Sequence, residues 1–206
     1  NNRHKDLFVF NLYIIISASP KSKKGSLNDE EENSNIKYKP PSAPYIKSIM
    51  KKNFCLVLDI DETIAHSLKL SSGYYFLLRP GAIEFLSEIS KYYEIIIFTS
   101  SPKTYADNIL NKIDYNRKLI SHRLYRDHVI YENGKSIKKL KMIGRDLTKT
   151  IFVDNLKSNA KDNPKNLYPI STWYSDIYDE ELIKLKDKLV YIATCGKYSD
   201  DITKAI

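Results

Sequence analysis

Three short, unbroken apolar runs restrict the fold of this chain more than any other feature. They lie within residues 54–58, 94–98 and 150–153, where the second range begins with Glu94 and the third with Thr150. Runs of this length without alternating polar residues are typical of strands buried on both faces, as in a parallel sheet covered by other layers. The segments between and after them have helical apolar spacing, so strands and helices alternate along the chain. This order predicts an α/β fold around a central parallel sheet.

Local signals place the helices and one hairpin. Helices are expected over residues 82–89, 102–113 and 181–193. At the start of the second helix, Ser101 is expected at the N-cap and Pro102 in the first turn. Asn133-Gly134 lies between two short apolar stretches, and this dipeptide predicts a hairpin.

A polar group follows each of the three apolar runs. Asp59-Ile60-Asp61-Glu62-Thr63 follows the first run, Thr99-Ser100-Ser101 the second and Asp154-Asn155 the third. In an open α/β sheet, ligands bind outside the carboxyl ends of the strands. A single Asp after a strand would indicate only a turn. Three polar strand ends in one sheet predict instead that carboxylates, hydroxyls and an amide converge on one site.

Two carboxylates two residues apart, Asp59 and Asp61, suit phosphoryl transfer. One can attack phosphorus and become an acyl phosphate, while the other protonates the leaving oxygen and then activates water. A divalent cation is needed to offset the repulsion between these anions and an anionic substrate. Mg²⁺ takes oxygen ligands and keeps several waters, so Asp59, Asp154 and Asn155 are a suitable partial shell.

The same residues carry a family resemblance. Asp59-Ile60-Asp61-Glu62-Thr63, followed by His66-Ser67, resembles the D-x-D-x-T motif of the haloacid dehalogenase superfamily, most closely in its FCP/SCP-type, NLI-interacting-factor-like protein phosphatases. The resemblance covers residues 51–202. Further matching segments are Leu78-Arg79-Pro80-Gly81, Phe98-Thr99-Ser100-Ser101, Tyr105-Ala106-Asp107, Gly144-Arg145-Asp146-Leu147 and Val153-Asp154-Asn155. The implied fold is a haloacid-dehalogenase-like, Rossmannoid three-layer fold with a central parallel sheet and no large cap domain.

The activity that the resemblance implies is that of a Mg²⁺-dependent serine/threonine protein phosphatase with an aspartyl-phosphate intermediate. Proteins of this type act on the C-terminal domain of RNA polymerase II and on other phosphoproteins. Asp59 would be the nucleophile and a metal ligand. Asp61 would be the general acid/base and lend its backbone carbonyl to the metal, while Thr63 would brace the loop. A calcium-binding loop is the alternative interpretation, but Ile64 stands where such a loop needs glycine.

The phosphate-binding and remaining metal-binding positions follow from the same resemblance. Thr99 would donate a hydrogen bond to a phosphoryl oxygen, and Lys138 would neutralise its charge. Asp154 and Asn155 would complete the Mg²⁺ site. Simpler interpretations also exist: Thr99 in a helix cap, Lys138 on a solvated lysine-rich face, and Asp154-Asn155 in a plain turn.

The sequence departs from the family pattern in two places. Leu156-Lys157 stands where the family often has Ser-Pro, which leaves the shape of that loop open. Only residues 68–75 separate the first motif from the next apolar segment. The longer hairpin insertion of the small family phosphatases, which helps to form a pocket for a proline beside the phosphoserine, is therefore expected to be missing or minimal.

The first fifty residues differ in character from the rest. Residues 1–20 hold an apolar segment that is expected to be a membrane anchor or signal peptide, a strand or helix packed on the domain, or a poorly ordered end. It is shorter than the ~20 residues that a spanning helix needs. Residues 21–50 are polar with a proline-rich end, which predicts a linker, and residues 51–206 form the phosphatase domain. A nuclear or cytoplasmic location is expected, with membrane-anchored or mitochondrial locations as alternatives.

The net charge and the cysteine and histidine residues limit the kinds of partner and metal that are expected. The net charge of +8 suits an anionic partner such as a phosphorylated protein or peptide. No basic stripe with interleaved aromatics stands out, so direct binding of nucleic acid is not expected. Cys55, Cys195 and the four histidines lack metal-site spacing, so zinc is not expected.

Two other functions compete with the phosphatase interpretation. The first is a non-enzymatic binding subunit that resembles the mitochondrial inner-membrane translocase component of the same fold. That subunit typically lacks an intact acidic motif, whereas Asp59, Asp61 and Thr63 are all present here. The second is a small-metabolite phosphatase, but such enzymes usually carry a sizeable cap domain for which this chain has no room.

Overall fold

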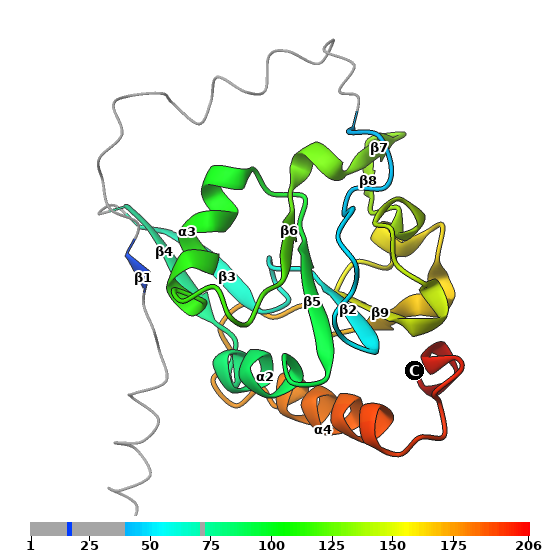
Figure 1. Ribbon diagram of the computed structural model, residues 1–206. Coiled ribbons are helices and arrows are strands. Elements are labelled where there is room, and N and C mark those ends of the chain that lie inside the picture. The colour runs from blue at the N-terminus through cyan, green and yellow to red at the C-terminus, as the bar shows by residue number, and fades with distance from the viewer. Residues whose placement is uncertain (1–15, 18–39, 71–72) are drawn as a thin grey trace, which may run out of the picture.

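A five-stranded sheet forms the centre of the molecule. The computed structural model describes residues 16–17, 40–70 and 73–206. The strand order is β10–β9–β2–β5–β6, and every neighbouring pair is parallel (Figure 1). The strands are β2 (Phe54–Leu58), β5 (Tyr93–Phe98), β6 (His122–Leu124), β9 (Thr150–Asp154) and β10 (Leu167–Pro169). The predicted central parallel sheet is confirmed, and the short outer strands β6 and β10 are additions to it.

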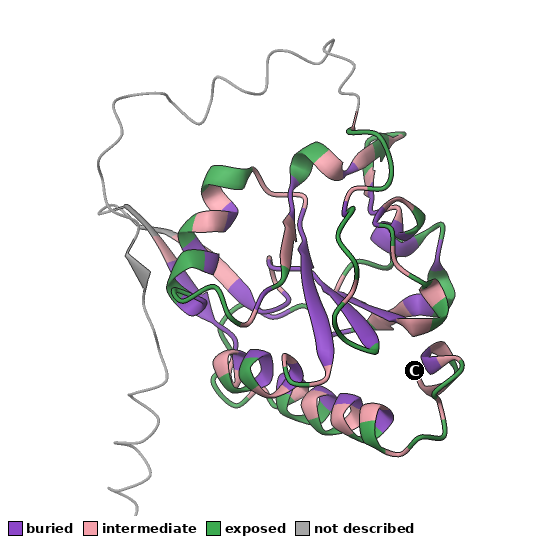
Figure 2. Cartoon of the chain, in the orientation of Figure 1, coloured by how far each residue is buried: buried purple, intermediate pink, exposed green. Residues whose placement is uncertain are grey.

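Three α-helices share one face of the sheet. They are α2 (Ala82–Ile89), α3 (Lys103–Ile113) and α4 (Glu181–Thr194). Their buried residues join one apolar cluster with Leu56 and Leu58 of β2. Cys55 and Val57 of the same strand belong to a second cluster on the opposite face. Figure 2 shows the resulting pattern, with buried central strands and helices exposed on their outer sides. Burial on both faces explains why the strand sequences do not alternate.

The opposite face is covered without α-helices. Ile46, Leu140 and Ile143 pack there against β2, β5 and β9. Leu140 lies in a short 3₁₀ helix, Leu140–Met142, and the described part of the chain contributes no α-helix to this cluster. The three-layer arrangement is therefore present, with one layer of α-helices and one of 3₁₀ turns and extended chain.

The folded domain begins before the boundary predicted at Lys51. The N–H of Tyr45 donates to the carbonyl of Met142 over 2.7 Å, and the Tyr45 hydroxyl donates to the carbonyl of His128 over 3.0 Å. Ile46 is buried. The end of the predicted linker is thus part of the domain, because its backbone and side chains find partners there.

Gly144 allows this segment to cross the domain closely. Its φ is +86°, and a Cβ at this position would lie 2.7 Å from Cβ of Pro44 and 2.8 Å from the carbonyl oxygen of Ile46. Both the left-handed backbone and the lack of space require glycine here.

Two hairpins extend from the sheet. The first pairs β3 (Ala65–Leu70) with β4 (Gly73–Leu78), and the second pairs β7 (Ile130–Glu132) with β8 (Lys135–Ile137). The second is the predicted one, and its turn residues Asn133 and Gly134 have φ values of 51° and 73°. The first occupies the short connection after the first motif as two six-residue strands. Among the described residues, this hairpin supplies the only strands between β2 and α2, and no large cap domain is present there.

Little of the N-terminal region is described. β1 (Ile16–Ser17) pairs antiparallel with β4 and makes a three-stranded sheet with the first hairpin. The rest of the predicted apolar segment and residues 21–39 of the predicted linker lie outside the described residues. Within the described ranges, no helix has the length and apolarity needed to cross a membrane.

Candidate active site

Polar groups from three neighbouring strands lie at one edge of the sheet. Asp59 follows β2, Thr99 follows β5 and Asp154 ends β9. Because β2 lies between the other two strands, these positions are adjacent. The N–H of Asp59 donates to the carbonyl of Val153 over 3.1 Å and continues the parallel pairing to the end of the strands. The predicted convergence of polar strand ends is present.

Lys138 lies between two of these carboxylates. Its Nζ is 2.8 Å from Oδ1 of Asp59 and 2.7 Å from Oδ2 of Asp154. All three residues are buried, with exposed fractions of 1% for Lys138, 5% for Asp59 and 0% for Asp154. The backbone fixes the lysine, because the N–H of Lys138 donates to the carbonyl of Asn159 over 2.9 Å. Among the described residues, Oδ2 of Asp59 has no hydrogen-bond partner, so one oxygen of this carboxylate remains available.

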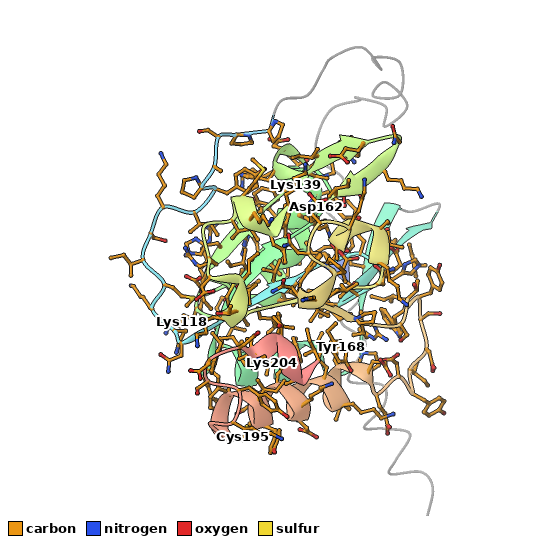
Figure 3. All side chains as sticks on the ribbon, turned by 90° about the vertical axis from the view of Figure 1, so that its right-hand side faces the viewer. Lys118, Lys139, Asp162, Tyr168, Cys195 and Lys204 are labelled. Atoms are coloured by element: carbon orange, nitrogen blue, oxygen red, sulfur yellow. The ribbon has the colours of Figure 1, made fainter. Side chains whose placement is uncertain are left out.

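The lysine that reaches the site is the one expected from the sequence. Lys139 instead points to the surface, where its Nζ lies 3.1 Å from Glu132 and 3.6 Å from Asp162. Figure 3 shows Lys139 and Asp162 at this surface, next to β7 and β8. The alternative of a purely solvated lysine face therefore applies to Lys139 and not to Lys138.

Burial and charge act in opposite directions on the central groups. Burial raises the pKa of Asp59 to about 7 against the opposing attraction of Lys138, and Asp154 and Asp61 add to the rise. Burial alone would lower the pKa of Lys138, but the combined attraction of Asp59 and Asp154 outweighs it and raises that pKa. The lysine therefore stays charged, and any further cation beside Asp59 would favour the ionised carboxylate.

Asp61 is held by hydroxyl groups from the segment after β5. The Tyr105 hydroxyl donates to Oδ1 over 2.6 Å, and the Ser101 hydroxyl donates to Oδ2 over 2.7 Å. Thr99 lies farther away, with its hydroxyl 3.5 Å from Oδ2. These donors fix the orientation of the Asp61 carboxylate beside Asp59.

Two of these donors have other roles than the sequence suggested. Ser101 was expected as an N-cap, but α3 begins at Lys103 after Pro102 and has no side-chain cap. Tyr105 lies in a segment that matches the family, and no role in the site was assigned to it. No spacing rule connects the two, because Ser101 precedes the helix and Tyr105 lies within it.

The loop after Asp59 is braced by contacts with the third strand end. Thr63 is fully buried, and its hydroxyl lies 3.5 Å from Oδ1 of Asn155. Asn155 in turn donates to the hydroxyl of Thr172 over 3.2 Å. All the residues predicted from the sequence therefore lie within this one edge of the sheet.

Asn159 is a site residue that sequence reasoning missed. Its side-chain amide lies 3.0 Å from both carboxylate oxygens of Asp154, and the N–H of Leu156 donates to Oδ1 over 2.8 Å. Asn159 lies in a 3₁₀ helix, Lys157–Ala160. No spacing rule points to it, because its contact depends on how the loop after β9 turns.

Arg79 ties the loop to the rest of the domain. This buried guanidinium donates to the carbonyl of Thr63 over 3.2 Å, to Ser171 and, over 2.7 Å from two nitrogens, to the two carboxylate oxygens of Asp179. The bidentate pair fixes the planar side chain. Arg79 therefore connects the first motif with the start of α4.

The donor set at this edge fits Mg²⁺. The described residues contain no cluster of three or more His, Cys, Asp or Glu side chains that could hold a metal. The site supplies oxygen atoms instead, from the Asp59 and Asp154 carboxylates and the Asn155 amide. A hard cation that retains several of its waters suits such a small oxygen set, whereas zinc does not.

Comparisons of the sequence with known proteins return phosphatases and a translocase subunit. A CTD small phosphatase-like protein 3 from Caenorhabditis elegans is 36% identical over 173 residues, which cover 76% of this chain and 60% of that protein. Phosphatase PSR1 from Saccharomyces cerevisiae is 36% identical over 147 residues, covering 64% of this chain and 34% of that protein. The mitochondrial import inner membrane translocase subunit TIM50 from Candida glabrata is 35% identical over 156 residues, covering 75% and 31%.

These relatives are longer than the chain. It spans between about a third and three fifths of their lengths. Among solved structures, that of Fcp1, an essential RNA polymerase II CTD phosphatase, aligns with 73% of the chain and 52% of that protein at 24% identity and a TM-score of 0.49.

The family comparison covers nearly the whole described domain. A sequence model of the family described as NLI interacting factor-like phosphatase matches residues 54–202. The matched range contains every strand of the central sheet, all three α-helices and all the polar groups at the site edge. This chain belongs to the NLI interacting factor-like phosphatase family.

Proposed function

We propose that the chain is a Mg²⁺-dependent phosphoprotein phosphatase that acts on serine or threonine phosphates through an aspartyl-phosphate on Asp59. One observation carries the proposal: the buried ammonium group of Lys138 lies between Asp59 and Asp154 at the strand ends. A cation at this position attracts an anionic phosphoryl group. Lys138 contacts only Oδ1 of Asp59, so Oδ2 is available to attack phosphorus.

In the first step, Oδ2 of Asp59 attacks phosphorus, and a new P–O bond forms while the bond to the serine or threonine oxygen breaks. Asp61, in its protonated form, donates its proton to the leaving oxygen. The Tyr105 and Ser101 hydroxyls hold the Asp61 carboxyl in place for this transfer. Lys138 offsets charge on the phosphoryl group.

In the second step, Asp61 accepts a proton from water, and the water oxygen attacks phosphorus. The bond to Asp59 breaks, inorganic phosphate leaves, and both carboxyl groups return to their starting states. Asp59, Asp154, Asn155 and the backbone carbonyl of Asp61 would hold Mg²⁺, which when bound offsets repulsion between anions and polarises the phosphoryl group.

The proposed substrate is a phosphorylated protein segment. The described insertion between β2 and α2 is a hairpin and not a cap, so an extended segment can reach the strand ends. Phosphorylated repeats of the kind found in the C-terminal domain of RNA polymerase II are the substrate type that the resemblance to the family suggests.

Hydrolysis of p-nitrophenyl phosphate and of phosphoserine peptides, with and without Mg²⁺, tests the proposal. We expect turnover that is lost with a chelator and regained with Mg²⁺, and no turnover by Asp59→Asn at any metal concentration. Folded protein without activity on any phosphate monoester would support the competing hypothesis of a binding subunit like the translocase component.

A further inference from the structure

A pocket lined mostly by polar residues lies at the end of the sheet opposite to Asp59. It has a volume of about 420 Å³ and lies where the chain enters β2, β5 and β6. Its walls come from residues 48–52, from the loop after α3 and from the first residue of β6, His122. In Figure 3, Lys118 lies beside the light-blue segment that leads into β2. We call this the basic pocket.

Positive side chains surround the basic pocket. Lys51, Lys52, Arg117 and Lys118 line it, and all four residues are exposed. Within the described ranges, none of the four forms an ion pair with a carboxylate. Lys52 donates to the carbonyl of Lys91 over 3.0 Å, which leaves its charge unbalanced. Most lysines on a folded surface are simply solvated, but here four cations share the walls of one cavity.

The acidic residue in the pocket does not balance these charges. Glu94 is buried, and its carboxylate accepts from the guanidinium of Arg145 through both of its oxygens. His122 lies 3.3 Å from the same carboxylate and 3.4 Å from the hydroxyl of Ser48. Glu94 is therefore neutralised by a partner outside the pocket. The excess of positive charge on the walls remains.

Hydrogen bonds to a buried aspartate, Asp114, fix the loop that carries Arg117 and Lys118. Asp114 is 3% exposed, and its carboxylate accepts the N–H groups of Lys118, Leu119 and Ile120 over 2.8–3.1 Å. The N–H of Arg117 donates to the carbonyl of Asp114 over 3.0 Å. A fixed backbone keeps the two cations beside the pocket, which lowers the entropy lost when a ligand binds.

We propose that the basic pocket binds a phosphoryl group carried on a protein segment. A phosphate monoester brings nearly two negative charges at pH 7, and several converging cations suit it better than a single carboxylate. The volume exceeds what one phosphate needs and leaves room for neighbouring residues. None of the described residues that line the pocket is Phe, Tyr or Trp, so the large stacking surfaces that single-stranded nucleic acid uses are lacking.

The basic pocket is separate from the site at Asp59. Glu94 stands near the start of β5, and Thr99 follows its end, so the strand separates the two sites by about 17 Å at ~3.3 Å per residue. The inference does not depend on the proposed function. A protein phosphorylated at several positions can reach both sites, and binding at one then raises the effective concentration at the other.

Nuclear magnetic resonance of the ¹⁵N-labelled Asp59→Asn protein tests the proposal. The ligands are inorganic phosphate, a phosphoserine peptide, the same peptide without phosphate, and a short single-stranded oligonucleotide. We expect saturable shifts of the Lys118, Ser121 and His122 amides with phosphate and the phosphopeptide, and none with the unphosphorylated peptide. The oligonucleotide should bind more weakly than the phosphopeptide.

Two variants with equal loss of charge locate the binding. The first combines Arg117→Ala with Lys118→Ala, and we expect its Kd for the phosphopeptide at these amides to rise about tenfold. The control combines Lys165→Ala with Lys184→Ala, two exposed lysines elsewhere, and its Kd should change less than about twofold. With Asp59 intact, the first variant should hydrolyse p-nitrophenyl phosphate at the normal rate.

Other results of the same experiments would contradict the proposal. An unchanged Kd in the first variant, or shifts confined to amides near Asp59 and Asp154, would overturn the proposal. So would an equal response to the unphosphorylated peptide, or tighter binding of the oligonucleotide. A chain that hydrolyses no phosphate monoester would remove the proposed function, yet the shifts at Lys118 would still test the basic pocket.

Discussion

At the scale of single residues, Lys138 places a positive charge between the buried carboxylates of Asp59 and Asp154. Lys138→Ala would leave Asp59 and Asp154 facing each other without a cation. We expect the free energy of unfolding to fall by about 3–5 kcal/mol, the usual cost of breaking a buried ion pair. We also expect kcat to fall by about 10²–10³, as when a donor to the reacting group is removed. Urea denaturation and phosphatase kinetics measure the two effects.

Lys139 supplies the matched control for this change. It is also a lysine and directly follows Lys138 in the sequence, but its partners Glu132 and Asp162 are at the surface. Lys139→Ala should leave both stability and kcat nearly unchanged, because exposed ion pairs contribute little. If Lys139→Ala were the inactive variant, the assignment of the lysine would be wrong.

Tyr105 provides a second test at this scale. Tyr105→Phe removes the hydroxyl that donates to Asp61 over 2.6 Å and keeps the ring, which packs against Phe76. A hydrogen bond to a charged group contributes about 1.5–3 kcal/mol, so kcat should fall roughly ten- to hundredfold with little change in KM. Tyr125→Phe is the control, because that hydroxyl donates to Asp107. Equal losses in both variants would show that the Asp61 contact has no special role.

At the scale of elements, alanine substitutions at Gly144 and Gly134 test how tightly the segment around Pro44 packs against Gly144. Gly144 and Gly134 both have left-handed backbones, but only Gly144 lacks room for a Cβ. Gly134→Ala should cost about 1–2 kcal/mol for the backbone alone. Gly144→Ala should cost about 1–3 kcal/mol more, because Pro44 and Ile46 must move. Equal unfolding free energies of the two variants would mean that Pro44 and Ile46 move aside without a measurable loss of stability.

The elements differ in how well the sequence predicts them. β2, β5 and β9 were predictable because burial on both faces leaves an unbroken apolar run in the sequence itself. The convergence of Asp59, Thr99 and Asp154 followed from the rule for parallel strand ends. The β3–β4 hairpin, the packing of Tyr45 and the contact of Asn159 with Asp154 were missed. Tyr45 contacts residues 83 and 97 positions away in the sequence, and the contact between Asn159 and Asp154 depends on how the loop after β9 turns. No local sequence pattern records either contact.

At the scale of the whole molecule, the lack of a cap in the described domain bears on substrate choice. An open site gives a small substrate few enclosing contacts, whereas a peptide can lie across the surface. We expect phosphoserine or phosphothreonine peptides to have a higher kcat/KM than sugar phosphates or nucleotides. The net charge of +8 should favour acidic flanking residues and make binding weaken with salt. Faster turnover of a metabolite than of every peptide would contradict the assignment to protein substrates.

The central claim is that phosphate passes through a covalent bond to Asp59, and chemical trapping tests it most directly. Borohydride reduces an acyl phosphate to an alcohol and so converts the phosphorylated aspartate into homoserine. The protein would be quenched with borohydride during turnover of a phosphopeptide, digested, and sequenced by mass spectrometry. The account predicts homoserine at position 59, only when substrate is present, and none in Asp59→Asn. Turnover without any trapped residue, or homoserine at another aspartate, would contradict it.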